Sequence, residues 1–222
     1  ALPIFANQLR QHGYTAQLHV ISNGISPAYT YGKREKEPWM QGFFNVLMVG
    51  RYAGEKRQDE LIDACAKSRH AREIQVILAG KGPLEKKYRK LAEKLPNPIV
   101  MSFYEPARLL DILHMADLYV HTSDAEIEAM SCMEAFACGL VPVIADSPRS
   151  ATPQFALDER SLFPAGDTDA LAARIDWWIE HPAEREEMEH RYAEHAKQYA
   201  LSESIRQTEE MFRMAIQEQK RA

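Results

Sequence analysis

Short apolar runs alternate with amphipathic segments along most of this chain, and the alternation limits its possible folds more than any other feature. The runs at 44–49, 74–79, 99–103, 118–121 and 141–145 have the length of buried strands. Between them, segments such as 84–94 and 109–115 space their apolar residues as helices do. Strands and helices in alternation predict right-handed βαβ units and a parallel sheet covered on both faces. We therefore expect an α/β fold that ends in helices.

The two ends of the chain differ from its middle. Residues 17–21 predict a short strand, and residues 31–38 are charged and aperiodic, as in a linker. Three helical stretches are expected from Asp169 onward, with breaks at His181-Pro182 and near Leu201-Ser202. The chain begins at Ala1 within an apparent helix, which indicates a piece of a longer protein.

Charge and cysteine content exclude several functional classes. Nucleic-acid binding favours a basic face, and nothing in a chain of net charge −5 points to one, so we expect no nucleic-acid partner. Cys65, Cys132 and Cys138 form no CxxC pair, which argues against a disulfide framework or a structural zinc site and favours a reducing cytoplasm. Cys132 and Cys138 are interpreted as core residues rather than nucleophiles. No apolar run approaches the roughly 18 residues that span a bilayer.

Polar residues follow the predicted strands, where an open parallel sheet binds its ligand. Gly50, Arg51 and Lys56 follow the strand 44–49. Arginine binds phosphate through two hydrogen bonds, and lysine adds a mobile positive charge. The N-terminus of a helix adds backbone N–H donors. The alternative is a solvated pair of cations. The position after a buried strand and a glycine favours a diphosphate site.

The turn Gly80-Lys81-Gly82-Pro83 resembles a dinucleotide fingerprint, but its third glycine is absent. We therefore reject hydride chemistry here. The glycines are expected to permit a tight turn near a ligand. Lys81 either lies near that ligand or faces solvent.

Glu126 and Glu134 lie eight positions apart, before the helix stop at Gly139. We place Glu126 in a loop and Glu134 in the following helix. Two carboxylates directed into one cleft suit a ligand rich in hydroxyl groups, because each oxygen accepts hydrogen bonds. The alternative is ordinary surface charge, and the apolar neighbours Met130, Met133 and Phe136 argue against it.

Three further features of the sequence have simpler, structural explanations. Asp167-Thr168-Asp169 has the form of a metal-binding DxD motif, but it directly precedes a helix, so we expect it to cap that helix. No histidine spacing indicates a metal site. His121 either faces the cleft or is structural, and Arg149 is a weak candidate for contact with a phosphate or an acceptor.

Taken in order, these segments resemble the C-terminal, Rossmann-like domain of glycosyltransferases with the GT-B architecture, group 1 family. The resemblance covers roughly residues 44–180 and is carried by Val49-Gly50-Arg51 with Lys56, Ala79-Gly80-Lys81-Gly82-Pro83, Glu126 to Glu134, Glu134-Ala135-Phe136-Ala137-Cys138-Gly139, and Pro164-Ala165-Gly166-Asp167 with Ala170-Leu171-Ala172. It implies that residues 1–43 are a remnant of an N-terminal acceptor domain and a linker. Residues 44–200 would bind a nucleotide sugar, and residues 201–222 would form a crossing helix.

The chain departs from the family pattern in two places. Ile127-Glu128-Ala129 stands where a Gly-Phe-Gly-like run is usual, so Glu128 competes with Glu126 for the first acidic role. Leu140-Val141-Pro142 carries one extra residue. The segment Glu128–Glu134 and the run Val143–Phe163 are more similar to bacterial enzymes that glucosylate cholesterol or diacylglycerol.

The resemblance implies specific roles for the site residues. Arg51 and Lys56 would hold the diphosphate and stabilise the leaving UDP, Glu134 would bind the ribose, and Glu126 the donor sugar. The base would lie by the loop Phe103-Tyr104-Glu105-Pro106. The implied donor-binding set is Gly50, Arg51, Lys56, Lys81, Tyr104, Glu126, Ala129, Met130 and Glu134. No metal or other cofactor is expected.

The implied reaction is transfer of a hexose from a UDP-sugar, most simply UDP-glucose, to a lipid hydroxyl with retention of configuration. The acceptor would bind through the missing N-terminal domain at the inner face of the cell membrane, and this piece alone is expected to be inactive. Three alternatives stay open: a nucleotide-sugar epimerase half, a UDP-sugar-binding module without transfer activity, and a structural domain that binds no nucleotide.

Overall fold

The computed structural model describes residues 3–219, so the first two and last three residues of the predicted terminal segments lie outside the described residues. Its centre is a six-stranded sheet in which every neighbouring pair of strands is parallel. The strands are β1 (Phe44–Val49), β2 (Ile74–Ala79), β3 (Val100–Ser102), β4 (Leu118–His121), β5 (Pro142–Asp146) and β6 (Leu162–Pro164). The predicted parallel α/β fold is confirmed.

The strand order is β3-β2-β1-β4-β5-β6. The chain therefore moves outward from β1 through β2 to β3, returns to β4 on the other side of β1, and then moves outward again. Right-handed crossovers place the helices of the two halves on opposite faces of such a sheet. The crevice between β1 and β4, at their carboxyl ends, is the switch point at which open α/β sheets bind ligands.

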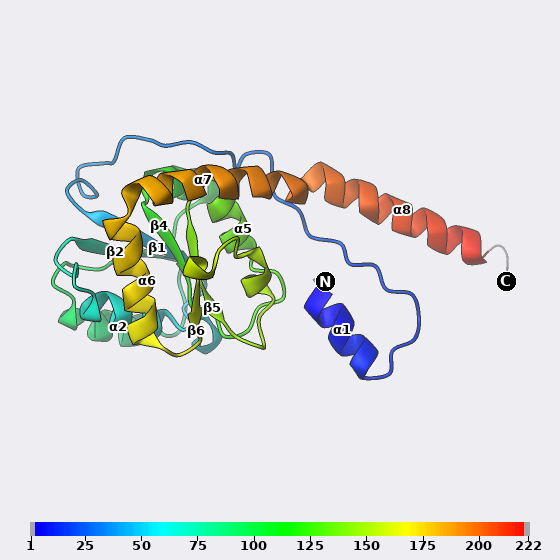
Figure 1. The fold of residues 1–222 in the computed structure, drawn as a ribbon, viewed down its shortest axis with the longest axis horizontal. Helices are drawn as coiled ribbons and strands as arrows, with labels where there is room; N and C mark the ends of the chain where they lie inside the picture. Colours follow the sequence, from blue (N-terminus) through cyan, green and yellow to red (C-terminus); the bar gives the residue numbers. More distant parts are fainter. Residues whose placement is uncertain (1–2, 220–222) are drawn as a thin grey trace.

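Eight α-helices surround or extend this sheet within residues 3–219 (Figure 1). They are α1 (Pro3–Gln11), α2 (Gln58–Lys67), α3 (Glu85–Leu91), α4 (Pro106–Met115), α5 (Met130–Ala137), α6 (Thr168–Glu180), α7 (Pro182–Ala196) and α8 (Leu201–Gln219). Helix α2 packs against α6, and α5 packs against α7. Helix α8 continues from α7 and extends away from the sheet, and α1 lies apart from it (Figure 1).

The strands are buried because helices cover both faces of the sheet, as their continuous apolar runs predicted. Every residue of β2 is buried, and the side chains of Val46 and Leu47 in β1 are fully enclosed. Gly139 separates α5 from β5 with a φ of +95°, a conformation that favours glycine. The predicted helix, glycine stop and buried strand are thus confirmed. Asp167 caps α6 by accepting hydrogen bonds from the backbone N–H groups of Asp169 and Ala170, as predicted.

The strand predicted at 17–21 is wrong. These residues belong to no sheet, and Leu18, His19, Val20 and Ile21 instead line a hollow with Gln207, Glu210 and Met214 of α8. The nearest β-type pairing is an isolated bridge between Ile25 and Ala200. Alternating polarity alone produces no strand where no neighbouring strand supplies a ladder of hydrogen bonds.

The aperiodic segment 31–38 forms no helix or strand but is attached to α4. The backbone N–H of Arg34 donates to the carbonyl of His114 at 3.0 Å, and Glu37 forms an ion pair with Arg108. The charges of this segment therefore fasten it to the main body. Within residues 3–219, no helix combines the length and apolar character needed to cross a membrane.

Candidate functional site

Four loops leave the carboxyl ends of β1 to β4 and meet above the switch point. Two cavities lie among them, joined by the loop 50–57 that follows β1. The first cavity has a volume of about 460 Å³ and is lined by Val49, Gly50, Arg51, Ala79, Gly80, Lys81, Gly82, Pro83, Phe103, Tyr104 and Leu109. We call it the Arg51 cavity. It brings together four predicted site residues, namely Gly50, Arg51, Lys81 and Tyr104.

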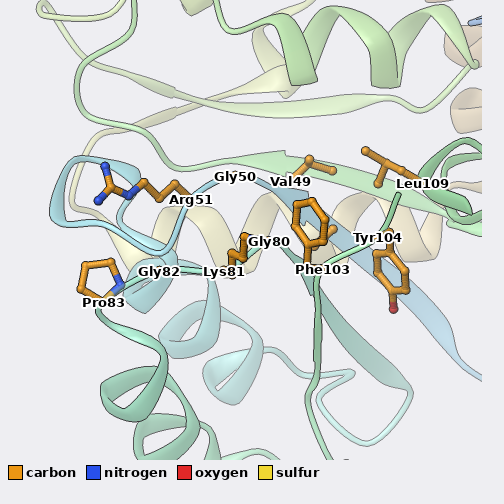
Figure 2. Close-up of a pocket in the computed structure, with 11 residues that line it drawn as sticks. Val49, Gly50, Arg51, Gly80, Lys81, Gly82, Pro83, Phe103, Tyr104 and Leu109 are labelled. Carbon is orange, nitrogen blue, oxygen red and sulfur yellow. The ribbon is translucent and has the colours of Figure 1, made fainter. Parts of the chain in front are cut away.

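The Arg51 cavity has a charged end and an aromatic end. Figure 2 shows Arg51 and Pro83 at one end, and Phe103, Tyr104 and Leu109 at the other. The ring of Phe103 is 53% exposed, and the ammonium of Lys81 lies 4.2 Å from its centroid. An accessible ring beside a cation offers a stacking surface for a planar heterocycle. Phe103 was predicted at the end of the strand 99–103, in the loop beside which the base would lie, but its exposure was not evident from the sequence.

Gly80 and Gly82 allow the loops after β1 and β2 to touch. A Cβ atom at Gly80 would lie 2.0 Å from the carbonyl oxygen of Gly50, and one at Gly82 would lie 2.5 Å from the carbonyl oxygen of Tyr52. The two loops are joined by hydrogen bonds from Tyr52 N–H to the Lys81 carbonyl (3.1 Å) and from Leu84 N–H to the Tyr52 carbonyl (3.2 Å). The glycines therefore serve a close approach between loops.

The second cavity has a volume of about 640 Å³ and is lined by Phe5, Asn23, Glu55, Lys56, Ala125, Glu126, Ile127, Glu128, Ala129, Met130 and Arg149. We call it the Glu126 cavity. It brings together four more predicted residues, namely Lys56, Glu126, Ala129 and Met130. The stem of Lys56 lies beside Gly50, since a Cβ there would be 3.7 Å from Cδ of Lys56. Lys56 therefore lies where the two cavities meet.

Glu126 lies in the loop before α5, as predicted, and its side chain is 13% exposed. Its Oε1 atom pairs with the ammonium of Lys56 and lies 3.3 Å from Nε2 of His121. Burial raises the pKa of this carboxyl, but the hydrogen bonds from His121 and Lys56 outweigh burial and lower the pKa to about 2. Glu126 is therefore an ionised acceptor at neutral pH.

Glu128, the competing carboxylate, is engaged elsewhere. Its two oxygens each accept from the backbone N–H of Asn23 at 3.0 Å, and Oε2 also accepts from the Asn23 amide at 2.5 Å. This contact attaches the segment before the sheet to the rim of the Glu126 cavity. The next residue, Ala129, has a φ of +50° at the start of α5, a conformation in which glycine is favoured. The departure from the family's glycine-rich run therefore places a strained alanine here.

Glu134 lies in α5, as predicted, but it lines neither cavity. Its half-buried carboxyl accepts a hydrogen bond from Tyr29. Burial raises the pKa of Glu134, and the Tyr29 hydrogen bond only partly opposes this effect. Burial also raises the pKa of Tyr29, to about 12, together with the charge of Glu134. The two glutamates thus lie in different electrostatic environments.

The remaining candidates have structural partners. The thiols of Cys132 and Cys138 are buried, and burial raises both pKa values, that of Cys138 to about 12, so neither is an activated nucleophile. Arg149 lines the Glu126 cavity and pairs with Asp124. Among the described residues 3–219, no cluster of His, Cys, Asp and Glu could hold a metal ion.

Tyr119 and Ser131 are neighbours of the site that were not predicted from the sequence. Their hydroxyl groups connect His121 to the end of β1. The available signal was the alternation of side chains along a strand, which places Tyr119 and His121 on the same face of β4.

Comparison with known proteins agrees with this geometry. The family model described as "Glycosyl transferases group 1" matches residues 32–199. The crystal structure of the catalytic domain of cholesterol-alpha-glucosyltransferase from Helicobacter pylori is similar to this chain, with 50% sequence identity and a TM-score of 0.69. The match covers 71% of this chain and 99% of the Helicobacter pylori chain.

Two more distant matches cover longer stretches of this chain. Alr3699/HepE from Anabaena, in complex with UDP and glucose, is 22% identical with a TM-score of 0.79, over 94% of this chain and 60% of that chain. EpsD from Bacillus subtilis is 28% identical over an alignment of 182 residues, which covers 78% of this chain and 48% of that protein. The chain therefore spans about half the length of this curated relative.

Proposed function

The chain belongs to the glycosyl transferases group 1 family, and we propose that it is the donor-binding half of a retaining enzyme that transfers glucose from UDP-glucose to a lipid hydroxyl. One observation carries the proposal. Arg51 and Lys56, from a single loop at the switch point, separate a cavity with an aromatic end from a cavity with an ionised carboxylate. A nucleotide sugar has the same order: base, diphosphate, sugar.

The bound donor would extend across both cavities. Its uracil would lie by the loop that carries Phe103 and Tyr104, and its diphosphate between Arg51, Lys56 and the N-terminus of α5. Backbone N–H groups and the helix dipole at such an end favour anions. Glu126 would accept hydrogen bonds from the sugar hydroxyls, and Glu134 would turn from Tyr29 to the ribose.

Transfer would depend chiefly on stabilisation of the leaving UDP. As the bond between the anomeric carbon and the phosphate oxygen breaks, negative charge grows on the diphosphate, where Arg51 and Lys56 lie ready. A preorganised donor of this kind typically contributes about 3–4 kcal/mol to transition-state stabilisation. The acceptor hydroxyl would attack from the face that UDP leaves, and the configuration at the anomeric carbon would be retained.

The proposal of a lipid acceptor is supported by the 50% identity to the catalytic domain of cholesterol-alpha-glucosyltransferase. A sterol or a diacylglycerol supplies a single hydroxyl at a membrane surface, which suits an enzyme that binds the inner face of the membrane peripherally. We propose that the acceptor is bound by a further domain, because this chain spans about half of its curated relative.

Calorimetric titration of this chain with UDP, UDP-glucose, UDP-galactose and GDP, each with and without Mg²⁺, tests the donor site. We expect binding of UDP and UDP-glucose in preference to GDP, with no requirement for the metal. Arg51→Ala should weaken both. Arg72→Ala is the matched control, because Arg72 is exposed at the opposite, amino end of β2. Equal binding by the Arg51 and Arg72 variants would refute the site.

Transfer itself requires the full-length protein, with radiolabelled UDP-glucose and vesicles that contain cholesterol or diacylglycerol. Formation of an α-linked glycolipid is the expected result. Binding of UDP-glucose without transfer to any acceptor would instead indicate a binding module.

A further inference from the structure

His121 is a buried histidine beside the donor site for which the mechanism above has no use. It is the last residue of β4, and only 1% of its surface is exposed. Its Nδ1 atom lies 3.3 Å from the hydroxyl of Tyr119, and its Nε2 atom lies 3.3 Å from Oε1 of Glu126. A polar ring removed from water needs partners for both nitrogens. Here Nδ1 has a phenol as its partner, whereas Nε2 faces the carboxylate of Glu126 without normal hydrogen-bond geometry.

When the ring of His121 is charged, the hydrogen bonds beside it run in one direction, from Nδ1 through two hydroxyl groups to the end of β1. The carbonyl oxygen of Val49 can only accept, so the Ser131 hydroxyl, 3.2 Å away, donates to it. The oxygen of Ser131 then accepts from the hydroxyl of Tyr119 at 3.0 Å. With its hydrogen engaged in this way, the oxygen of Tyr119 accepts from Nδ1 of His121, 3.3 Å away, whenever that nitrogen carries a hydrogen.

Nε2 faces an acceptor in every state of this chain of bonds. When the imidazole is charged, Nδ1–H donates to Tyr119 and Nε2–H donates to Glu126. When it is neutral, its single hydrogen belongs on Nε2, because an ionised carboxylate offers only lone pairs. The hydroxyl of Tyr119 then rotates from Ser131 to Nδ1. The two hydroxyls therefore adapt to the ring, while the hydrogen on Nε2 faces Glu126 in both forms.

His121 and Lys56 share one oxygen of Glu126. Within the described part of the chain both contact Oε1, which leaves Oε2 as an acceptor for a ligand hydroxyl. The contact from Nε2 is long, at 3.3 Å, and lacks hydrogen-bond geometry in the unliganded chain, where Lys56 already holds the same oxygen. A donor diphosphate would draw Lys56 away, and a carboxylate left without a partner would be free to rotate or take up a proton.

We propose that His121 is a positioning residue for recognition of the donor sugar: its Nε2–H holds Oε1 of Glu126 when Lys56 turns to the diphosphate. Tyr119 and Ser131 fix the orientation of the ring. The inference rests on the proposed binding of a UDP-sugar, but the state of the ring can be measured without any ligand.

The first measurement is ¹⁵N NMR of the histidine rings in the unliganded chain at neutral pH, with the His121 signal assigned by its absence from His121→Gln. We expect a protonated Nε2. The second is calorimetry of UDP and UDP-glucose with His121→Leu, which has no donor, and with His121→Gln, whose side-chain amide can donate. His121→Leu should weaken UDP-glucose binding by about ten- to a hundredfold and leave UDP binding unchanged, because UDP lacks the sugar.

Rescue of UDP-glucose affinity in His121→Gln would support the positioning role, since a merely structural histidine would affect both ligands alike. An unprotonated Nε2 in the wild-type chain would overturn the inference. Equal weakening of UDP and UDP-glucose in a folded His121→Leu variant would also overturn it. If the folded wild-type chain binds no nucleotide, the proposed function fails and the positioning role fails with it, whatever the ring's protonation.

Discussion

Gly80→Ala should destabilise the chain by about 2–3 kcal/mol because it separates the loops that follow β1 and β2. The added Cβ would lie 2.0 Å from the carbonyl oxygen of Gly50 and 2.9 Å from its carbonyl carbon. Both contacts are with backbone, so no side-chain rotation relieves them, and the Gly50 loop must move by about 1 Å or more.

That displacement acts on the hydrogen bonds that join the loops. They are Gly50 N–H to the Ala79 carbonyl (2.9 Å), Tyr52 N–H to the Lys81 carbonyl (3.1 Å) and Leu84 N–H to the Tyr52 carbonyl (3.2 Å). At about 1 kcal/mol for each, their loss gives the estimate above. For a chain of this size, the melting temperature should fall by about 5–10 °C.

Gly54→Ala is the matched control, in the same loop. A Cβ at Gly54 meets nothing within 4 Å, and its φ is not positive. Alanine there should leave stability unchanged or raise it by about 0.5 kcal/mol, through a smaller entropy of the unfolded chain.

Denaturant unfolding and UDP titration of both variants provide the assay. Gly80→Ala should lose stability and nucleotide affinity together, because the displaced loop carries Arg51. Equal stability of the Gly80 and Gly54 variants would refute the close contact between the loops.

Three other perturbations have expected outcomes. The Glu126–Lys56 network should contribute about 3 kcal/mol to the free energy of unfolding above pH 4.5. This contribution should be lost as the pH falls to about 2, because a carboxyl with a lowered pKa favours the folded state only while it is ionised. A Glu126→Gln variant that shows the same acid limb in denaturant unfolding would contradict this. Ala129→Gly should stabilise the folded chain by about 1 kcal/mol, because glycine relieves the strain of a positive φ. Ala53→Gly, at a φ of −138°, is the control and should destabilise the folded chain. The same shift of the melting temperature in both variants would disprove the strain at Ala129. Phe136 is fully buried among aromatic rings, so Phe136→Ala should lower the free energy of unfolding by about 3–5 kcal/mol, as measured in denaturant. A loss below about 1 kcal/mol would show that the core collapses into the space left by the ring.

The central strands could be predicted from the sequence because both of their faces are buried. Strands 44–49 and 74–79 have the predicted ends, since each apolar run stops where the chain leaves the core. The strand β6 was not predicted, because three residues, Leu162–Pro164, carry too little pattern to stand out. The wrong strand at 17–21 shows the converse limit, because pairing depends on which segment lies alongside.

The loops of the candidate site could be grouped from the sequence, whereas the contacts of individual side chains could not. Residues that follow strands meet at one edge of a parallel sheet, so Gly50, Arg51 and Lys81 could be grouped from the sequence. The contact of Glu134 with Tyr29 depends instead on a segment about a hundred residues away in the chain. The chain of hydrogen bonds through His121 depends on hydroxyl orientations that no spacing encodes.

The contrast between the two glutamates indicates how the site would respond to a ligand. Glu126 already has a cation and an imidazole, and its pKa is low. Glu134 has a raised pKa, and within residues 3–219 its described partner is the hydroxyl of Tyr29. A buried carboxylate with one donor gains more from a ribose diol than a carboxylate that is already paired. Nucleotide binding should therefore lower the pKa of Glu134, release a proton at pH values where that carboxyl is protonated in the free chain, and strengthen as the carboxyl ionises.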